Sequence, residues 1–247
     1  MSITTEEELV GMQAAGVIAR KVLEAMKQQV RPGVTTAQLD AIGNRAMLEH
    51  GARSAPAMVY GFPGGSCISV NDEVVHGIPG ERALADGDLV KLDVTIEKDG
   101  FMADTAATVA VGAVSPERSQ LMECAERAFF KAMLVARAGF RVFEIGRAVE
   151  KEVRRSGFSV VRPLCGHGIG RTIHEDPQVP NFLDLQARSI LTEGLVITVE
   201  PIIAAGTGEE FLAEDGWTVR TVDQSMAAHY EHTIVITRGK PIVLTAA

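Results

Sequence analysis

The chain has 247 residues, 46% of them hydrophobic, and a formal net charge of -8 at pH 7. This acidity, without any basic run, argues against nucleic acid as the main partner, and no apolar stretch approaches the roughly 18 residues that a membrane span needs. The acidic start MSITTEEELV is unlike a signal or transit peptide, and three widely spaced cysteines fit neither a disulfide framework nor a zinc knuckle, so we expect a cytoplasmic protein.

Two helices are predicted at the start of the chain. Apolar residues at spacings of three and four run through residues 5–30, with Thr4 and Thr5 as candidate N-caps and Arg31-Pro32-Gly33 as the end. A second helix is expected from about Thr36 to His50. Residues 54–67 are rich in Gly, Pro and Ser, which predicts a loop.

Residues 88–111, DLVKLDVTIEKDGFMADTAATVAV, predict two strands joined by a tight turn at Lys98-Asp99-Gly100. Asp93 and Asp104 lie one on each strand, among apolar or small residues. A two-residue turn pairs residues whose numbers sum to 197 or 199, and either odd sum places the two aspartates on the same face, directly opposite or one diagonal apart. Facing inward they would need a proton or a cation. A solvated face is the alternative for the hairpin alone.

The second half of the chain repeats the pattern of the first. Helices are expected from Ser115 to Gly139 and from Val142 to Ser156. An offset of 106 residues aligns the glycines that close the helices of the two halves, and an offset of 107 sets Asp93 on Glu200. We interpret this as an internal duplication within a single catalytic domain, residues 1–247, whose halves are about 1–112 and 113–247.

The duplication predicts that equivalent positions meet near a pseudo-twofold axis, so that Glu200 approaches Asp93 and Asp104. A last strand pair, residues 217–223 and 228–237, is expected to supply Glu231. Four adjacent carboxylates need counter-charge, which two divalent cations would provide.

A neutral nitrogen ligand for such cations is available in the segment CGHGIG. His167 lies between glycines that allow a close approach of the backbone. The alternative for a single histidine is an ordinary structural residue.

These residues match a known pattern. The set Asp93, Asp104, His167, Glu200 and Glu231, within DVTIEKDGFMADT, CGHGIG, ITVEP and YEHTIVIT, resembles the type I methionine aminopeptidases of the M24 metallopeptidase family. The resemblance covers essentially the whole chain. It implies the α+β pita-bread (creatinase/aminopeptidase) fold, in which two pseudo-twofold-related halves share a central antiparallel sheet with outer helices. It also implies a metallo-aminopeptidase that removes the N-terminal (initiator) methionine from peptides and nascent proteins through a metal-bridged hydroxide.

The resemblance also implies a role for each ligand. Asp93 would chelate one metal ion through both oxygens, while Asp104 and Glu231 would bridge two ions. His167 and Glu200 would complete the coordination of the second ion, and Glu200 would accept the proton of the attacking water. Co(II), Mn(II), Fe(II) and Zn(II) all suit this set of donors.

Further side chains are implied for the substrate. His76 would contact the scissile amide, and His174 would stabilise the oxyanion formed from the carbonyl, with a partly exposed loop histidine as the alternative for each. The methionine pocket would be lined by Tyr60, Phe62, Cys67 and Trp217. Ordinary core packing is the alternative for Phe62 and Trp217.

The sequence departs from the family pattern at three places. Ile173 stands where Phe is usual and His229 where Gln is common, and the loop before Phe62 lacks an aromatic residue at Val59. We expect these changes to touch the pocket wall and the surroundings of the metal ions. His232 should point to the opposite face of its strand from Glu231 and is taken as structural.

Three alternative functions compete with this interpretation. Aminopeptidases that cleave before proline, and dipeptidases of the same fold, share the five ligands but generally carry a large additional N-terminal domain, whereas the first helix here begins near residue 5. A non-catalytic binding module would be marked by lost ligands, and a plain α/β domain would leave the five ligands unexplained. The expected partners are peptides and nascent polypeptides, with the ribosome as a candidate, and we expect a monomer that binds neither nucleic acid nor membranes.

Overall fold

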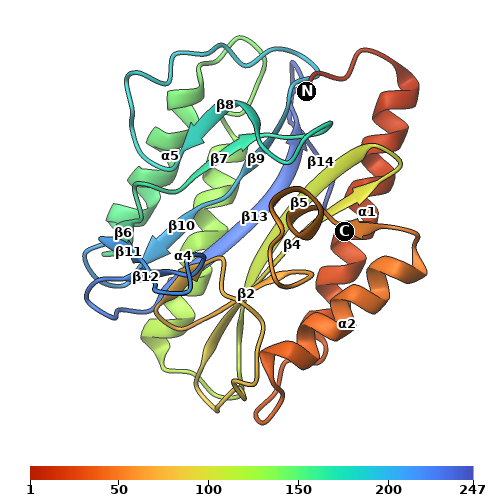
Figure 1. Ribbon diagram of the computed structural model, residues 1–247. Helices are drawn as coiled ribbons and strands as arrows, with labels where there is room; N and C mark the ends of the chain where they lie inside the picture. Colours follow the sequence, from red (N-terminus) through yellow and green to blue (C-terminus); the bar gives the residue numbers. More distant parts are fainter. Residues whose placement is uncertain (247) are drawn as a thin grey trace.

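The protein is described by a computed structural model that covers residues 1–246 (Figure 1). Its helices are α1 (Glu6–Lys27), α2 (Thr36–Glu49), α3 (Ala55–Tyr60), α4 (Pro116–Met133) and α5 (Val142–Arg155). Its strands are β1 (Arg53–Ser54), β2 (Cys67–Val70), β3 (Glu73–Val75), β4 (Leu89–Lys98), β5 (Phe101–Ala110), β6 (Ser159–Val160), β7 (Cys165–Gly168), β8 (Glu175–Pro180), β9 (Val196–Val199), β10 (Ile202–Ala204), β11 (Glu210–Leu212), β12 (Val219–Thr221), β13 (Ala227–Val235) and β14 (Ile242–Val243). No helix in the described part combines the length and the apolarity that crossing a membrane would take.

A central antiparallel sheet organises the fold. Its main path of strands follows the order β1-β4-β5-β13-β9-β7-β8, so β13 lies in the middle, with β5 and then β4 on one side and β9 on the other. Helix α1 packs against β4 and β5, α2 packs against α1, and α4 packs against β13, as Figure 1 shows. The predicted α+β architecture, with a central antiparallel sheet and outer helices, is therefore the one observed.

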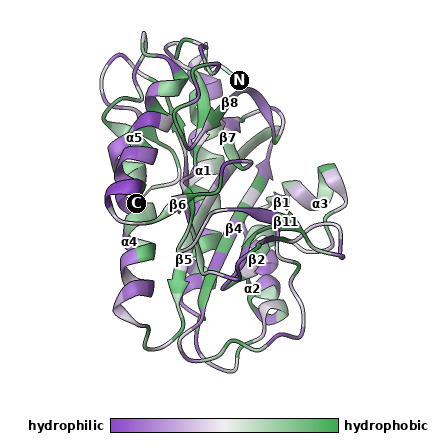
Figure 2. Cartoon of the chain, turned by 90° about the vertical axis from the view of Figure 1, so that its left-hand side faces the viewer, coloured by the Kyte–Doolittle hydropathy of each residue, from purple (hydrophilic) through white to green (hydrophobic). Residues whose placement is uncertain are grey.

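Helices α1, α2, α4 and α5 cover one face of this sheet. Val90, Leu92 and Val94 of β4 pack into a buried cluster with α1 and α2. Ala228 and Ile234 of β13 do the same with α4 and α5, and α5 carries hydrophilic residues on its outer side (Figure 2). Because side chains alternate along a strand, the odd-numbered residues of β4 and β13 point to the other face of the sheet.

The β4–β5 hairpin has the predicted register. Asp93 lies opposite Ala106, and Asp104 lies opposite Thr95, so paired numbers sum to 199 and the two aspartates are diagonal neighbours on one face. The turn forms because Asp99 and Gly100 both adopt positive φ, of 49° and 82°, which matches the twist of a two-residue hairpin.

Three predicted elements differ in the structure. The first helix ends at Lys27 and the third long helix at Met133, short of Val30 and Gly139, because turns close each helix early. Residues 55–60, predicted as loop, form α3. Its N-terminus is capped by the Ser54 hydroxyl, which accepts a hydrogen bond from the Ala57 N–H, and it ends at Gly61 in the left-handed conformation.

The two last predicted strands both form, but the prediction that they pair with each other is wrong. β12 pairs with β11 and β3 in a separate three-stranded sheet, whereas β13 pairs with β5, β9, β10 and β14. Between the two strands, the Asp223 carboxylate accepts hydrogen bonds from the backbone N–H groups of Thr207 and Ser225. These bonds hold a turn that directs the chain away from β12.

Candidate metal centre

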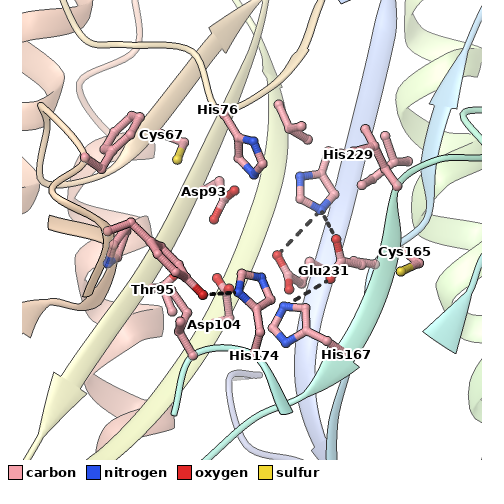
Figure 3. A pocket seen from close by; sticks show the side chains of 18 of the residues that line it. Cys67, His76, Asp93, Thr95, Asp104, Cys165, His167, His174, His229 and Glu231 are labelled. Carbon is pink, nitrogen blue, oxygen red and sulfur yellow. Dashed lines mark hydrogen bonds and ion pairs between the residues drawn. The ribbon is translucent and has the colours of Figure 1, made fainter. Parts of the chain in front are cut away.

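One cavity of about 600 Å³ lies on the face of the sheet opposite α1, α2, α4 and α5 (Figure 3). The five predicted metal ligands line it: Asp93, Asp104, His167, Glu200 and Glu231. So do the six predicted substrate-contacting side chains: Tyr60, Phe62, Cys67, His76, His174 and Trp217. The fold therefore gathers in one place residues that are up to 171 positions apart in the sequence.

The central strands place three of the four carboxylates around one small residue. Ala106 of β5 has Asp93 of β4 opposite it on one side and Glu231 of β13 opposite it on the other. Asp104 lies two residues before Ala106 on the same face. Alanine leaves the space between these carboxylates open. Glu200 directly follows β9, the next strand beyond β13.

His167 lies on β7, a strand that packs closely against its neighbours. A Cβ atom at Gly166 would lie 2.6 Å from the Thr198 carbonyl oxygen, which explains the glycine there. The His167 Nδ1–H donates to the Gly168 carbonyl at 2.9 Å, so Nε2 carries the lone pair and lies 3.6 Å from Glu200 Oε1. Burial, with a contribution from His174, lowers the pKa of His167 to about 4, so the ring is neutral at pH 7.

The four carboxylates have no lysine or arginine partner among the residues that the structure describes. Burial raises the pKa of Asp93, Glu200 and Glu231, with further contributions from neighbouring carboxylates, and it raises the pKa of Asp104 to about 6.

The buried Lys91 ammonium offers these carboxylates no hydrogen bond. It donates instead to the carbonyls of Asn71 and Ala227, at 2.6 and 3.3 Å.

The donor set fits divalent metal ions. Ligand atoms of Asp104, His167 and Glu231 lie within 4.8 Å of one another, and those of Asp93, His229 and Glu231 form a second such group. Asp104 Oδ1 and Glu231 Oε1 are buried without any hydrogen-bond partner. Buried carboxylate oxygens need a partner, and none is supplied by a hydrogen bond here. Together with a neutral imidazole they form a set of ligands that suits a divalent metal ion.

The other two predicted histidines stand at the exposed rim of the cavity. His76 adopts a left-handed backbone conformation with φ of 57°, uncommon outside glycine. His174 Nδ1 lies 2.6 Å from the Tyr60 hydroxyl, and its ring lies 4.2 Å from that of His167. Tyr60, predicted only as pocket wall, thus also orients His174. Partial desolvation lowers the pKa of both His76 and His174.

The apolar side of the cavity is built from aromatic and thiol groups. The Phe62 and Trp217 rings meet edge to face with centroids 5.3 Å apart. Cys67 of β2 lies opposite Asp93 of β4, and burial, with Asp93, raises the pKa of its thiol well above the ordinary value.

The three departures from the family pattern do not all reach the cavity. Ile173 and His229 line it, whereas Val59 is 45% exposed and lies outside its lining. The expectation that all three changes touch the pocket is therefore wrong for Val59, because α3 turns this side chain outward.

Sequence reasoning missed several cavity residues, among them Thr95 and Cys165. Thr95 lies opposite Asp104 on the β4–β5 hairpin, so the two side chains share one face of the sheet. The alternation that places Asp93 on the inner face of β4 could have revealed it. Cys165 precedes His167 by two residues on β7 and lines the cavity near Glu200.

Comparison with known proteins decides the family. The sequence pattern of metallopeptidase family M24 matches residues 10–238. The chain belongs to this family. M24 membership implies the use of divalent metal ions, in agreement with the donor set.

Individual proteins of known sequence or structure also resemble this chain. "Methionine aminopeptidase 2" of Bacillus subtilis is 45% identical over 99% of each chain. The crystal structure of methionine aminopeptidase from Rickettsia prowazekii is 38% identical and superimposes with a TM-score of 0.96 over all of both chains. Prolidase from Pyrococcus furiosus, 22% identical, shares the fold at a TM-score of 0.79 but is matched over only 65% of its length. The resemblance to methionine aminopeptidases and the pita-bread fold are thus confirmed.

Proposed function

We propose that this M24 metallopeptidase is a metal-dependent aminopeptidase that removes the N-terminal methionine from peptides and nascent proteins. The observation that carries the proposal is the convergence of four carboxylates and His167 in one cavity with an aromatic and thiol wall. Similarity to methionine aminopeptidases over the full chain supports the same activity.

Two divalent ions are proposed for the centre. Glu231 belongs to both groups of close ligand atoms, so its two oxygens suit a bridging position between a site at Asp93 and a site at Asp104 and His167. When bound, such ions polarise the scissile carbonyl and bring the pKa of a water close to neutrality. The donors suit Mn(II), Fe(II), Co(II) and Zn(II).

Glu200 is proposed to accept the proton of the attacking water. Its Oε1 accepts a hydrogen bond from the Thr198 hydroxyl at 2.8 Å, which fixes the carboxylate and leaves Oε2 free toward the cavity. Burial, with a contribution from Asp104, raises the pKa of Glu200 above its ordinary value, which makes this carboxylate a stronger proton acceptor.

His174 and His76 are proposed to act on the substrate amide. If the Tyr60 hydroxyl donates to His174 Nδ1, the opposite nitrogen Nε2 carries the proton and can donate to the developing oxyanion. His76 stands across the cavity rim, where its ring can contact the scissile amide. The Phe62 and Trp217 rings, with Cys67, offer a polarisable wall for a methionine thioether.

The proposal extends to the whole chain and its setting. We infer a single catalytic domain with two related halves, since α1 and α2 accompany β4 and β5 much as α4 and α5 accompany β9 and β13. A cytoplasmic monomer that acts on peptides and nascent polypeptides, with the ribosome as a candidate partner, accords with the acidic composition.

Peptide hydrolysis tests the proposal directly. Metal-free protein is given Mn(II), Fe(II), Co(II) or Zn(II) in turn, and release of free amino acid is measured from Met-Ala-Ser, Leu-Ala-Ser and Ala-Pro-Ser. We expect release of methionine from the first peptide only, and none after treatment with a chelator. Asp104→Asn should abolish this release, and Asp99→Asn, the same change in the exposed turn of the same hairpin, should not. Cleavage of Ala-Pro-Ser alone, or activity that is indifferent to chelator, would overturn it.

A further inference from the structure

His229 is buried in the wall of the cavity, and the proposed mechanism assigns it no role. It precedes Glu231 by two residues on β13, so the two side chains share one face of the strand. The residue is only 2% exposed, and both ring nitrogens are buried without a hydrogen-bond partner. Buried polar atoms are almost always satisfied, so an imidazole with two unpartnered nitrogens facing a cavity indicates a ligand that binds there.

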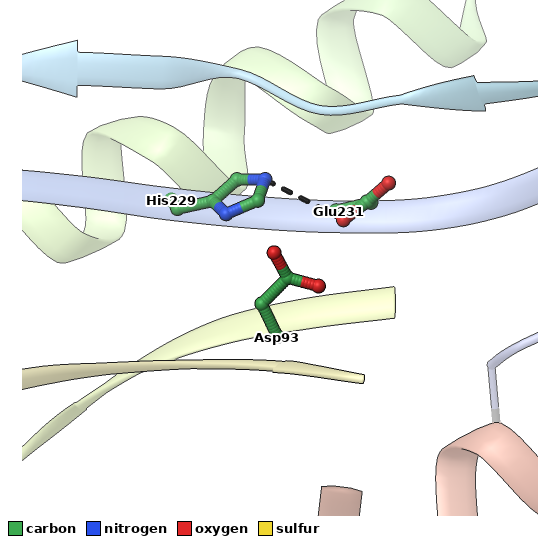
Figure 4. A group of neighbouring side chains, drawn as sticks. All are labelled: Asp93, His229 and Glu231. Atoms are coloured by element: carbon green, nitrogen blue, oxygen red, sulfur yellow. Dashed lines mark ion pairs between the residues drawn. The ribbon is translucent and has the colours of Figure 1, made fainter. Parts of the chain in front are cut away.

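The distances around His229 suit a shared cation better than a direct hydrogen bond. Its Nε2 lies 3.5 Å from Glu231 Oε2 (Figure 4). The same nitrogen lies 3.9 Å from Glu200 Oε2. Both exceed the roughly 2.7–3.2 Å of an N–H···O bond. Two donor atoms that each lie about 2.1 Å from one ion are roughly 3.0–3.4 Å apart at octahedral to tetrahedral angles, which is close to the first distance.

Asp93 completes the group from the facing strand. A carboxylate oxygen of Asp93, a ring nitrogen of His229 and a carboxylate oxygen of Glu231 lie within 4.8 Å of one another. Figure 4 shows the Asp93 carboxylate pointing from β4 toward both residues of β13. The group mirrors the other one, Asp104, His167 and Glu231, with an aspartate, an imidazole and the shared Glu231 in each.

We propose that His229 is a metal ligand, binding together with Asp93 and Glu231 the divalent ion at the Asp93 position. The inference rests on the proposed two-ion centre and adds a sixth ligand to it. Each ion then has one imidazole nitrogen among its donors. A nitrogen donor shifts the Asp93 position toward borderline ions such as Zn(II) and Co(II), and away from Mn(II), which prefers oxygen.

Zinc binding to metal-free protein tests this assignment without measuring turnover. Nitrogen-15 NMR of the imidazole rings is recorded during titration with ZnCl2, and isothermal titration calorimetry gives the number of zinc ions bound and their affinities. The variants are His229→Gln and, as control, His232→Gln. The control is the same change on the same strand, but its ring faces away from the cavity and bonds Tyr230 and Thr245.

We expect a ring nitrogen of His229 to move to a metal-bound chemical shift as zinc is added. His229→Gln should weaken one of the two binding steps by at least the roughly 10–100-fold that even outer-shell changes cause, whereas His232→Gln should leave both steps unchanged. If His229→Gln fails to fold, the NMR titration of the unmodified protein decides alone.

Failure of this inference is distinguishable from failure of the proposed function. If the His229 resonances do not respond to zinc while Glu231→Gln abolishes zinc binding, the two-ion centre stands and His229 is no ligand. If Glu231→Gln retains both binding steps at unchanged affinity, the proposed centre itself is refuted, and the role of His229 with it.

Discussion

Removing one charge from the metal-free centre should stabilise the protein, although the same change removes a proposed ligand. In Asp104→Asn the shape of the side chain is kept and the carboxylate is replaced by an amide. Asp104 is buried with Asp93 and Glu231 nearby, and its Oδ1 has no hydrogen-bond partner. Without bound metal, an ionised Asp104 therefore opposes folding.

The size of the effect follows from the pKa of this carboxyl group. Burial raises it from 3.8 to about 6, and a displacement of about two pKa units corresponds to roughly 3 kcal/mol of lost stability once the group is ionised in both states. The amide must still find hydrogen-bond partners in this buried site, at a cost of about 1 kcal/mol. We expect a net gain of about 2 kcal/mol, or a rise in the thermal midpoint of roughly 4–8 °C.

The contribution of Asp104 to the stability of the metal-free protein falls as pH rises. Because the folded-state pKa lies above the unfolded value, the protonated group favours the folded protein fully below pH 3.8, and this contribution is lost as pH rises through about 6. The stability advantage of Asp104→Asn should thus grow over this range. Metal should act in the opposite direction, because about 2.7 kcal/mol of stabilisation at a hundredfold excess over Kd is available only to a protein that binds it.

Urea unfolding monitored by circular dichroism measures both effects. Wild type, Asp104→Asn and Asp99→Asn are compared in chelator at about pH 4 and about pH 7.5, and again with Zn(II). If metal-free Asp104→Asn is less stable than wild type at the higher pH, or if zinc stabilises both equally, the description of Asp104 as an uncompensated metal ligand is refuted.

Three further predictions concern residues around the centre. His174→Ala should keep its metal but lose roughly 10²–10³-fold in kcat, as expected for one oxyanion donor, and loss of bound metal would instead make it a ligand. Thr198→Val removes the hydroxyl that orients Glu200 and should lower activity roughly 10–100-fold. Unchanged kinetics with Met-Ala-Ser would show that this bond is not needed. Phe62→Ala should raise KM for Met-Ala-Ser with metal content unchanged, because it removes the edge-to-face partner of Trp217. An unaltered KM would place the methionine elsewhere.

Much of the local structure could be predicted from the sequence because its causes are local. Side-chain alternation and the Asp99-Gly100 turn determine the register of the β4–β5 hairpin within about twenty residues. Thr5 and Ser115 cap their helices through hydroxyls that accept hydrogen bonds three residues along. The carboxylates of Asp93 and Asp104 likewise stand out in the sequence, because the strands around them are otherwise apolar or small.

Other features depend on contacts between distant segments. The pairing of β5 with β13 joins residues more than 120 positions apart, and it decides that Glu231 meets Asp93 across Ala106. The sequence alone did not show that β12 would leave β13 for a separate sheet.

The sequence by itself therefore determined which strands carry acidic groups and on which face of each strand they lie. Only the tertiary structure decided that Tyr60 orients His174 and that His229 is buried beside Glu231 with both nitrogens free. The physical reason is the sequence separation of the interacting residues. Turns, helix caps and side-chain alternation depend on neighbours within a few residues, whereas a cavity forms where packed elements from the whole chain meet.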